Sequence, residues 1–189
     1  MTMTEYPHAR VALRSNAMDL RRSVNGAIAG GVAAMVWAAQ QPLDKRVFGC
    51  DYDDVEMLGK LVTSEAGWPA AGLALHVQNG ALFGAAYAQA RPFMPGHPLV
   101  SALIASMAEN FGSWPAARLV DNLHPARRDI PKLFGNRRAL AQATWRHALF
   151  GIVMGEVERR LNANDADEPP PVPVSSNGHG DIELAVGAA

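Results

Sequence analysis

Residues 26–39 read GAIAGGVAAMVWAA, and no side chain in this stretch is charged or carries a hydroxyl, amide or carboxyl group. A helix on the surface of a globular protein normally shows a polar stripe, whereas a helix that is apolar on every side lies in a central core or spans a membrane. The wider segment 23–43 contains no charged residue. Its length is close to the roughly 20 residues that a membrane helix needs. The stretch therefore predicts a membrane-spanning helix.

Three further segments are depleted in charge. They are residues 66–90, 92–117 and 139–155. The first contains no charged residue, the second contains only Glu109, and the third contains only Arg146. A chain of 189 residues is too short to place four such helices at its centre, because a small domain leaves much of its surface in contact with solvent. We therefore predict an all-α fold, a four-helix membrane bundle that occupies residues 21–162.

Overall composition excludes several classes of function. The formal net charge is −1, which gives no basic field for nucleic acid. The single cysteine, Cys50, excludes a disulfide within the chain and any metal site with several cysteines. We predict no nucleic-acid partner and no bound metal.

Both ends of the chain differ in composition from the bundle. Residues 1–20 are polar and are predicted to form a mobile N-terminal tail. Residues 163–189 combine acidic residues with a proline run and a Ser-Ser-Asn-Gly stretch. Such a composition buries too little apolar surface to fold, so we predict a disordered C-terminal tail.

A short helix is predicted in the first loop of the bundle, within residues 51–62. Asp51 is a suitable N-cap, and acidic residues fill the first turn. Val55, Leu58 and Leu61 form one apolar stripe on the predicted helix. We expect an amphipathic helix that lies at the membrane surface or against the bundle.

One spacing of histidine and glycine occurs twice, 71 residues apart. The first copy is His76, Gly80 and Gly84, and the second is His147, Gly151 and Gly155. Residues four apart share a helix face, so each histidine lies one turn from a glycine groove. The same shift places Gly26 and Gly30 over His97 and Ser101. This pattern predicts two related helical hairpins, formed by segments one and two and by segments three and four.

Three GxxxG pairs predict close contacts between helices. They are Gly26 and Gly30, Gly80 and Gly84, and Gly151 and Gly155. Within a bilayer, small residues let helix backbones approach and pack. We therefore expect the lipid bilayer as the environment, and a second copy of the chain or other membrane helices as partners.

Isolated polar residues in the apolar segments are the candidates for binding. They are His76, Asn79, Glu109, Asn110, Arg146 and His147. The two histidines are expected at similar depth. Each could bond to a neighbouring oxygen, or the pair could form a proton relay or ligate haem b. Glu109 is expected to pair with Arg146, His76 or His147, or to lie hydrated at the interface. We predict no catalytic residue and no cofactor, with haem b as the alternative.

The charges of the loops predict an orientation in the membrane. The N-terminal tail is basic, whereas residues 44–65 carry three bases and six acids. The positive-inside rule then places the N-terminus in the cytoplasm of a multi-pass protein of the bacterial inner membrane. The basic loop 118–138 contradicts this rule in a four-span arrangement.

The small-residue stretch 26–34 is followed by Pro42-Leu43, and further matching segments run from Asp54 to Gly59 and from His76 to Tyr87. The last matching segment is 147–155. Over residues 24–162 this arrangement resembles the YagU-like family of uncharacterised four-helix bacterial inner-membrane proteins. The resemblance implies four membrane helices and no established activity. The basic third loop and Arg146 depart from the family pattern.

These observations leave three functions open. The first is a non-enzymatic membrane protein for helix packing, assembly or the cell envelope. The second is a membrane redox or proton-handling protein that uses His76 and His147. The third is a soluble, Gly/Ala-rich helical binding module. The chain contains no G-x-S-x-G, Walker A, HExxH or GxGxxG motif, so we do not predict an enzyme.

Overall fold

The computed structural model describes residues 20–163, so almost all of both predicted tails lies outside the described range. The α-helices are α2 (Leu20–Phe48), α3 (Asp54–Val62), α4 (Trp68–Ala90), α5 (Pro98–Ser113), α6 (Ala117–Leu123) and α7 (Arg137–Leu161). Short 3-10 helices follow α4 and α5, as η1 (Arg91–Phe93) and η2 (Trp114–Ala116). The described residues contain no strand, which confirms the all-α prediction.

The prediction of a multi-pass inner-membrane protein is wrong. Within residues 20–163, no helix combines the length and the hydropathy that a membrane span requires. Counting charged residues overestimated the hydropathy of these segments, because they are rich in alanine and glycine. Their small side chains contribute little to transfer into lipid, which is driven by leucine, isoleucine, phenylalanine and valine.

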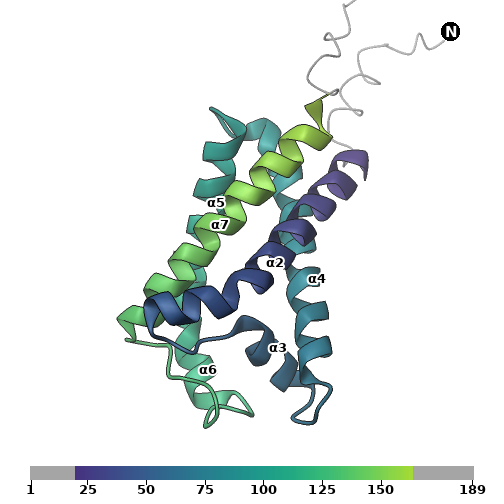
Figure 1. The fold of residues 1–189 in the computed structure, drawn as a ribbon. Helices are drawn as coiled ribbons and strands as arrows, with labels where there is room; N and C mark the ends of the chain where they lie inside the picture. Colours follow the sequence, from purple (N-terminus) through teal and green to yellow (C-terminus); the bar gives the residue numbers. More distant parts are fainter. Residues whose placement is uncertain (1–19, 164–189) are drawn as a thin grey trace, which may run out of the picture.

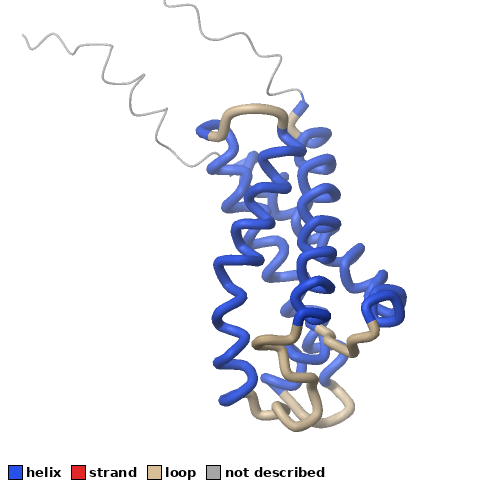
Figure 2. The backbone as a smooth tube through the Cα atoms, turned by 90° about the vertical axis from the view of Figure 1, so that its left-hand side faces the viewer, coloured by secondary structure: helices blue, strands red, loops and turns tan. Residues whose placement is uncertain are grey.

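Four long helices form a row in the order α4, α2, α7, α5 (Figure 1). Helix α2 packs against both α4 and α7, and α7 packs against α5. A view turned by 90° shows the long helices running along the same axis of the molecule (Figure 2). The pairs α2–α4 and α5–α7 are the two hairpins that the sequence predicts.

The contact between α2 and α4 is a contact between backbones. Gly30 lies opposite Gly80, and Gly26 lies opposite Gly84, so the two helices are antiparallel. A Cβ atom added to Gly30 would overlap the carbonyl oxygen of Gly80. One added to Gly80 would lie 2.6 Å from Cβ of Ala34. Glycine is therefore required on both sides of this contact.

Helices α5 and α7 also meet through small residues. A Cβ atom added to Gly155 would lie 2.7 Å from Cβ of Ala102, and one added to Gly151 would lie 3.1 Å from Cβ of Ser106. Gly151 faces the carbonyl oxygen of Ala102, one residue beyond the position that the 71-residue shift assigns to Gly30. His97 lies before the helix as its N-cap and accepts a hydrogen bond from the backbone N–H of Leu99.

The short helix α3 packs against α4 and lies beside the bundle. Its N-cap is Asp53, and not Asp51 as predicted, because the Asp53 side chain accepts a hydrogen bond of 3.0 Å from the backbone N–H of Glu56. Two further glycines allow the close approach of α3 and α4. A Cβ atom on Gly59 would overlap a carbonyl oxygen of α4, and one on Gly72 would overlap a carbonyl oxygen of α3.

Substitution of Gly30 by alanine tests the backbone contact. We expect Gly30→Ala to lower the free energy of unfolding by about 2 kcal/mol or more, because its methyl group meets rigid backbone. The adjacent Gly31→Ala is the control, because its Cβ would lie 3.8 Å from the nearest atom, Cγ1 of Val77. Alanine should stabilise that site by about 0.5–1 kcal/mol. Urea denaturation followed by circular dichroism measures both, and equal stability of the two variants would contradict the interpretation.

Candidate functional site

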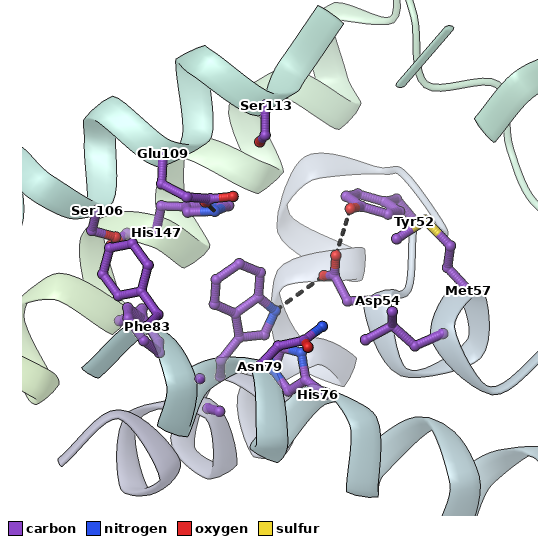
Figure 3. A pocket seen from close by; sticks show the side chains of 15 residues that line it. Tyr52, Asp54, Met57, His76, Asn79, Phe83, Ser106, Glu109, Ser113 and His147 are labelled. Atoms are coloured by element: carbon purple, nitrogen blue, oxygen red, sulfur yellow. Dashed lines mark hydrogen bonds and ion pairs between the residues drawn. The ribbon is translucent and has the colours of Figure 1, made fainter. Parts of the chain in front are cut away.

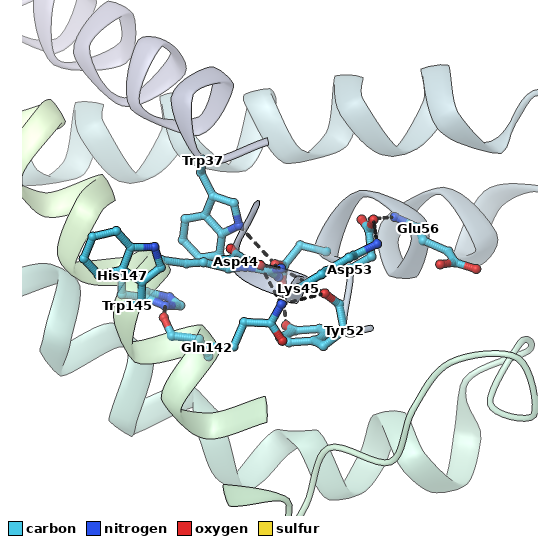
Figure 4. A network of polar contacts seen from close by, with 12 residues as sticks. Trp37, Asp44, Lys45, Tyr52, Asp53, Glu56, Gln142, Trp145 and His147 are labelled. Carbon is cyan, nitrogen blue, oxygen red and sulfur yellow. Dashed lines mark hydrogen bonds and ion pairs between the residues drawn. The ribbon is translucent and has the colours of Figure 1, made fainter. Parts of the chain in front are cut away.

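A buried ion network joins α7 to α2 and α3 (Figure 4). The Arg146 side chain has no exposed surface. Its Nε and Nη2 donate to the two carboxylate oxygens of Asp44, each at 2.6 Å, and Nη1 donates to Oδ2 of Asp54 at 2.7 Å. Nη2 also donates to the backbone carbonyl of Tyr52 at 2.9 Å. The guanidinium is thus bonded on all of its nitrogens.

Other side chains donate further hydrogen bonds to the carboxylates of Asp54 and Asp44. Asp54 accepts hydrogen bonds from the Tyr52 hydroxyl at 2.5 Å and from the Trp37 indole N–H at 3.1 Å. Gln142 Nε2 donates to Oδ1 of Asp44 at 2.6 Å. Charges buried without such partners are very costly, so a saturated network is the form in which they persist.

The network shifts the pKa values of its members. Burial lowers the pKa of Arg146, but the hydrogen bonds that Arg146 donates to Asp44 and the charge of Asp54 outweigh this effect, so the pKa is raised. Burial raises the pKa of the Tyr52 hydroxyl well above 10.0, and the neighbouring Asp54 raises it further. Two carboxylates face one guanidinium, which leaves this buried group with an excess of one negative charge.

A cavity of about 300 Å³ lies between α4 and α5 (Figure 3). These helices stand at the two ends of the row and, among the described residues, do not pack along each other. Helices α2, α3 and α7 also contribute residues to its lining. Its apolar lining includes Trp37, Met57, Leu58, Phe83 and Phe150. Its polar lining includes Tyr52, Asp54, His76, Asn79, Ser106, Glu109, Ser113 and His147.

Both histidines of the repeated spacing line this cavity and contact the same indole. The ring centroid of Trp37 lies 5.2 Å from that of His76 and 4.7 Å from that of His147, with interplanar angles of 70° and 71°. These are edge-to-face contacts, which hold aromatic rings at fixed angles. The structure therefore brings two histidines from different hairpins to one site.

His147 is bonded at both ring nitrogens. Nε2 lies 2.5 Å from Oε2 of Glu109, and Nδ1 lies 2.8 Å from the carbonyl oxygen of Ala143. A carbonyl and a carboxylate only accept hydrogen bonds, so this arrangement suits a ring protonated on both nitrogens. The hydrogen bond from His147 lowers the pKa of Glu109 against the opposing effect of burial. Glu109 thus pairs with His147 and not with Arg146, whose partners are Asp44 and Asp54.

His76 differs from His147 because one of its nitrogens has no partner. The residue is 8% exposed, and Nε2 is buried without a hydrogen bond. Burial lowers the pKa of His76, while the charge of Asp54 and a hydrogen bond to the Ala34 backbone oppose the shift. Nε2 is therefore a buried polar atom without a partner in a residue that lines the cavity.

The remaining predicted residues are distributed around the site. Asn79 lines the cavity next to His76 (Figure 3). Asn110 lies behind the wall, is 1% exposed, and donates to the Thr144 hydroxyl at 3.1 Å. Arg146 lies in the ion network behind Asp54. No cluster of three potential ligands that could hold a metal ion occurs within residues 20–163.

Comparisons of the chain with protein-family models, curated proteins and solved structures gave no match. The resemblance to the YagU-like family therefore stays a prediction.

Removal of the buried arginine tests the ion network. We expect Arg146→Met to lower the free energy of unfolding by about 3–5 kcal/mol, because it leaves two buried carboxylates without their cation. The control is Arg159→Met on the same helix, whose ion pair with Glu156 is exposed and should contribute less than about 1 kcal/mol. Chemical denaturation compares the two, and similar losses would show that burial does not decide the strength of these pairs.

Acid titration tests the bond between Glu109 and His147. The pKa of Glu109 is lower in the fold than its ordinary value of 4.5, so its stabilisation is present above that value and lost as the pH falls through the folded pKa. Glu109→Gln should therefore reduce the loss of stability between about pH 6 and pH 3, by less than about 1 kcal/mol because the carboxylate is 41% exposed.

The measurement is urea denaturation over this pH range. The control is Glu65→Gln, which alters an exposed carboxylate in the turn before α4. If the free energy of unfolding of Glu109→Gln fell with pH in the same way as that of the unmodified protein does, the contact between Glu109 and His147 would contribute nothing to stability in solution.

Proposed function

We propose that this protein is a helical binding module that holds a small organic molecule in the cavity between α4 and α5. The observation that carries the proposal is the unpartnered Nε2 of His76. Buried polar atoms nearly always have a hydrogen-bond partner, so an exception needs an explanation. A polar group of a ligand would supply the missing partner.

The lining of the cavity supports this proposal. Binding sites for small molecules are mostly apolar and aromatic concavities with a few polar groups that fix orientation. Here Trp37, Phe83 and Phe150 supply aromatic surface, and the ring centroids of the two phenylalanines lie 5.6 Å apart. His76 and Glu109 supply polar groups from opposite sides, because they belong to α4 and α5.

The walls of the cavity are also held in place before any ligand arrives. The glycine contacts fix α4 against α2, and the ion network fixes α3 and α7 against α2. Trp37 is restrained by its bond to Asp54. A preformed site loses less conformational entropy on binding than a flexible one, which favours a binding role.

A fragment screen with the ¹⁵N-labelled full-length protein tests this function. We expect compounds with an aromatic or aliphatic body and one polar group to shift the indole N–H resonance of Trp37. His76→Phe should weaken their binding about tenfold, because it removes the unpartnered ring nitrogen and retains a ring of similar size. His97→Asn is the control, because it changes a histidine outside the cavity and keeps an N-cap for α5. A folded protein whose Trp37 resonance responds to no fragment would overturn the proposal.

A further inference from the structure

We propose that the ligand of this cavity is an organic ammonium: a primary or secondary amine, protonated at neutral pH, attached to a small apolar body. This inference rests on the proposed function and names the class of molecule that the site would select. It follows from the charge around the cavity, from the hydrogen-bonding groups in its wall, and from its aromatic surface.

The charge balance around the cavity is negative. None of the residues that line it is lysine or arginine. Arg146 lies behind the wall and is shared by two carboxylates, Asp44 and Asp54, which leaves one negative charge uncompensated. The negative charge of Glu109 is at most cancelled by the positive charge of a protonated His147. The field in this partly enclosed space therefore favours a positive ligand, and it does so more strongly than at an open surface.

Groups that line the cavity can accept hydrogen bonds from an ammonium. Asn79 offers an amide oxygen, and Nε2 of His76 has no hydrogen-bond partner among the described residues. The Glu109 carboxylate bonds His147 through Oε2 and stays 41% exposed. An ammonium has hydrogen-bond donors and no acceptor, so it complements the Glu109 carboxylate and the Asn79 amide oxygen. A carboxylate ligand has only acceptors and would meet repulsion from Glu109.

Aromatic surface provides the third element. Trp37 lies against the rings of His76, His147 and Phe150, and Phe83 contacts Phe150. These rings offer apolar area for the body of the ligand. Tryptophan and phenylalanine faces also attract a cation that has lost part of its water shell. An amine beside Trp37 would gain from both effects.

Three matched probes test the inference: 2-phenylethylamine, 2-phenylethanol and 3-phenylpropanoate. They share an aromatic ring on a short chain and differ in charge. Titration calorimetry with the full-length protein at neutral pH should show the amine binding at least about tenfold more tightly than the alcohol, and the carboxylate binding most weakly.

Equal binding of the amine and the alcohol, or tighter binding of the carboxylate, would overturn the ammonium inference and leave the cavity as a binding site. Failure of all three in a protein that binds other fragments would overturn it as well, whereas failure of every fragment would overturn the proposed function itself.

Matched variants separate the charge from the shape of the site. Glu109→Gln should weaken the binding of 2-phenylethylamine about tenfold and leave that of 2-phenylethanol nearly unchanged, because it removes one charge at constant size. Glu156→Gln is the control, since this carboxylate pairs with Arg159 and Arg160 away from the cavity. Circular dichroism confirms that each variant is folded. An unchanged amine affinity in folded Glu109→Gln would contradict the role given to this carboxylate.

Discussion

The buried guanidinium of Arg146 constrains most of the structure. It bonds to Asp44 near the end of α2, to Asp54 at the start of α3, and to the backbone at Tyr52 between them. A single side chain from α7 therefore fixes three successive parts of the chain. Because an uncompensated buried charge is so costly, these elements cannot separate independently of one another. Asp54 also binds the indole of Trp37, so the same network forms the back wall of the cavity.

Small residues determine where the helices pack closely. The cavity lies between the two helices at the ends of the row. Glycines bring α4 against α2, and glycines facing Ala102 and Ser106 bring α7 against α5. No such contact joins α4 to α5 in the described part of the chain, and the large rings of Phe83 and Phe150 lie on the side where these helices face each other. Close packing at the three contacts of the row, α4–α2, α2–α7 and α7–α5, is thus compatible with open space between α4 and α5.

Much of the fold could be predicted from the sequence, because charge depletion and glycine spacing are local signals. The four apolar segments correspond to α2, α4, α5 and α7, and the predicted glycines lie at helix contacts. The error about the membrane came from the same signals. One face of α2 carries Val24, Ile28 and Val32, which are 49%, 49% and 42% exposed, so an apolar helix here leaves one side uncovered, although no described helix is long and apolar enough to span a membrane.

Pairing between distant residues could be predicted only in part. The charge-free segment 23–43 stops before Asp44, yet α2 continues through Pro42 to Phe48 and carries Asp44 inward to Arg146. No local pattern indicates a partner more than 100 positions away. The meeting of His76, Glu109 and His147 was more accessible to reasoning. A polar residue in an otherwise apolar helix must face either solvent or other polar groups, so isolated polar residues on neighbouring helices tend to converge. Here they converge on the cavity between α4 and α5, which His76 lines with its unpartnered nitrogen.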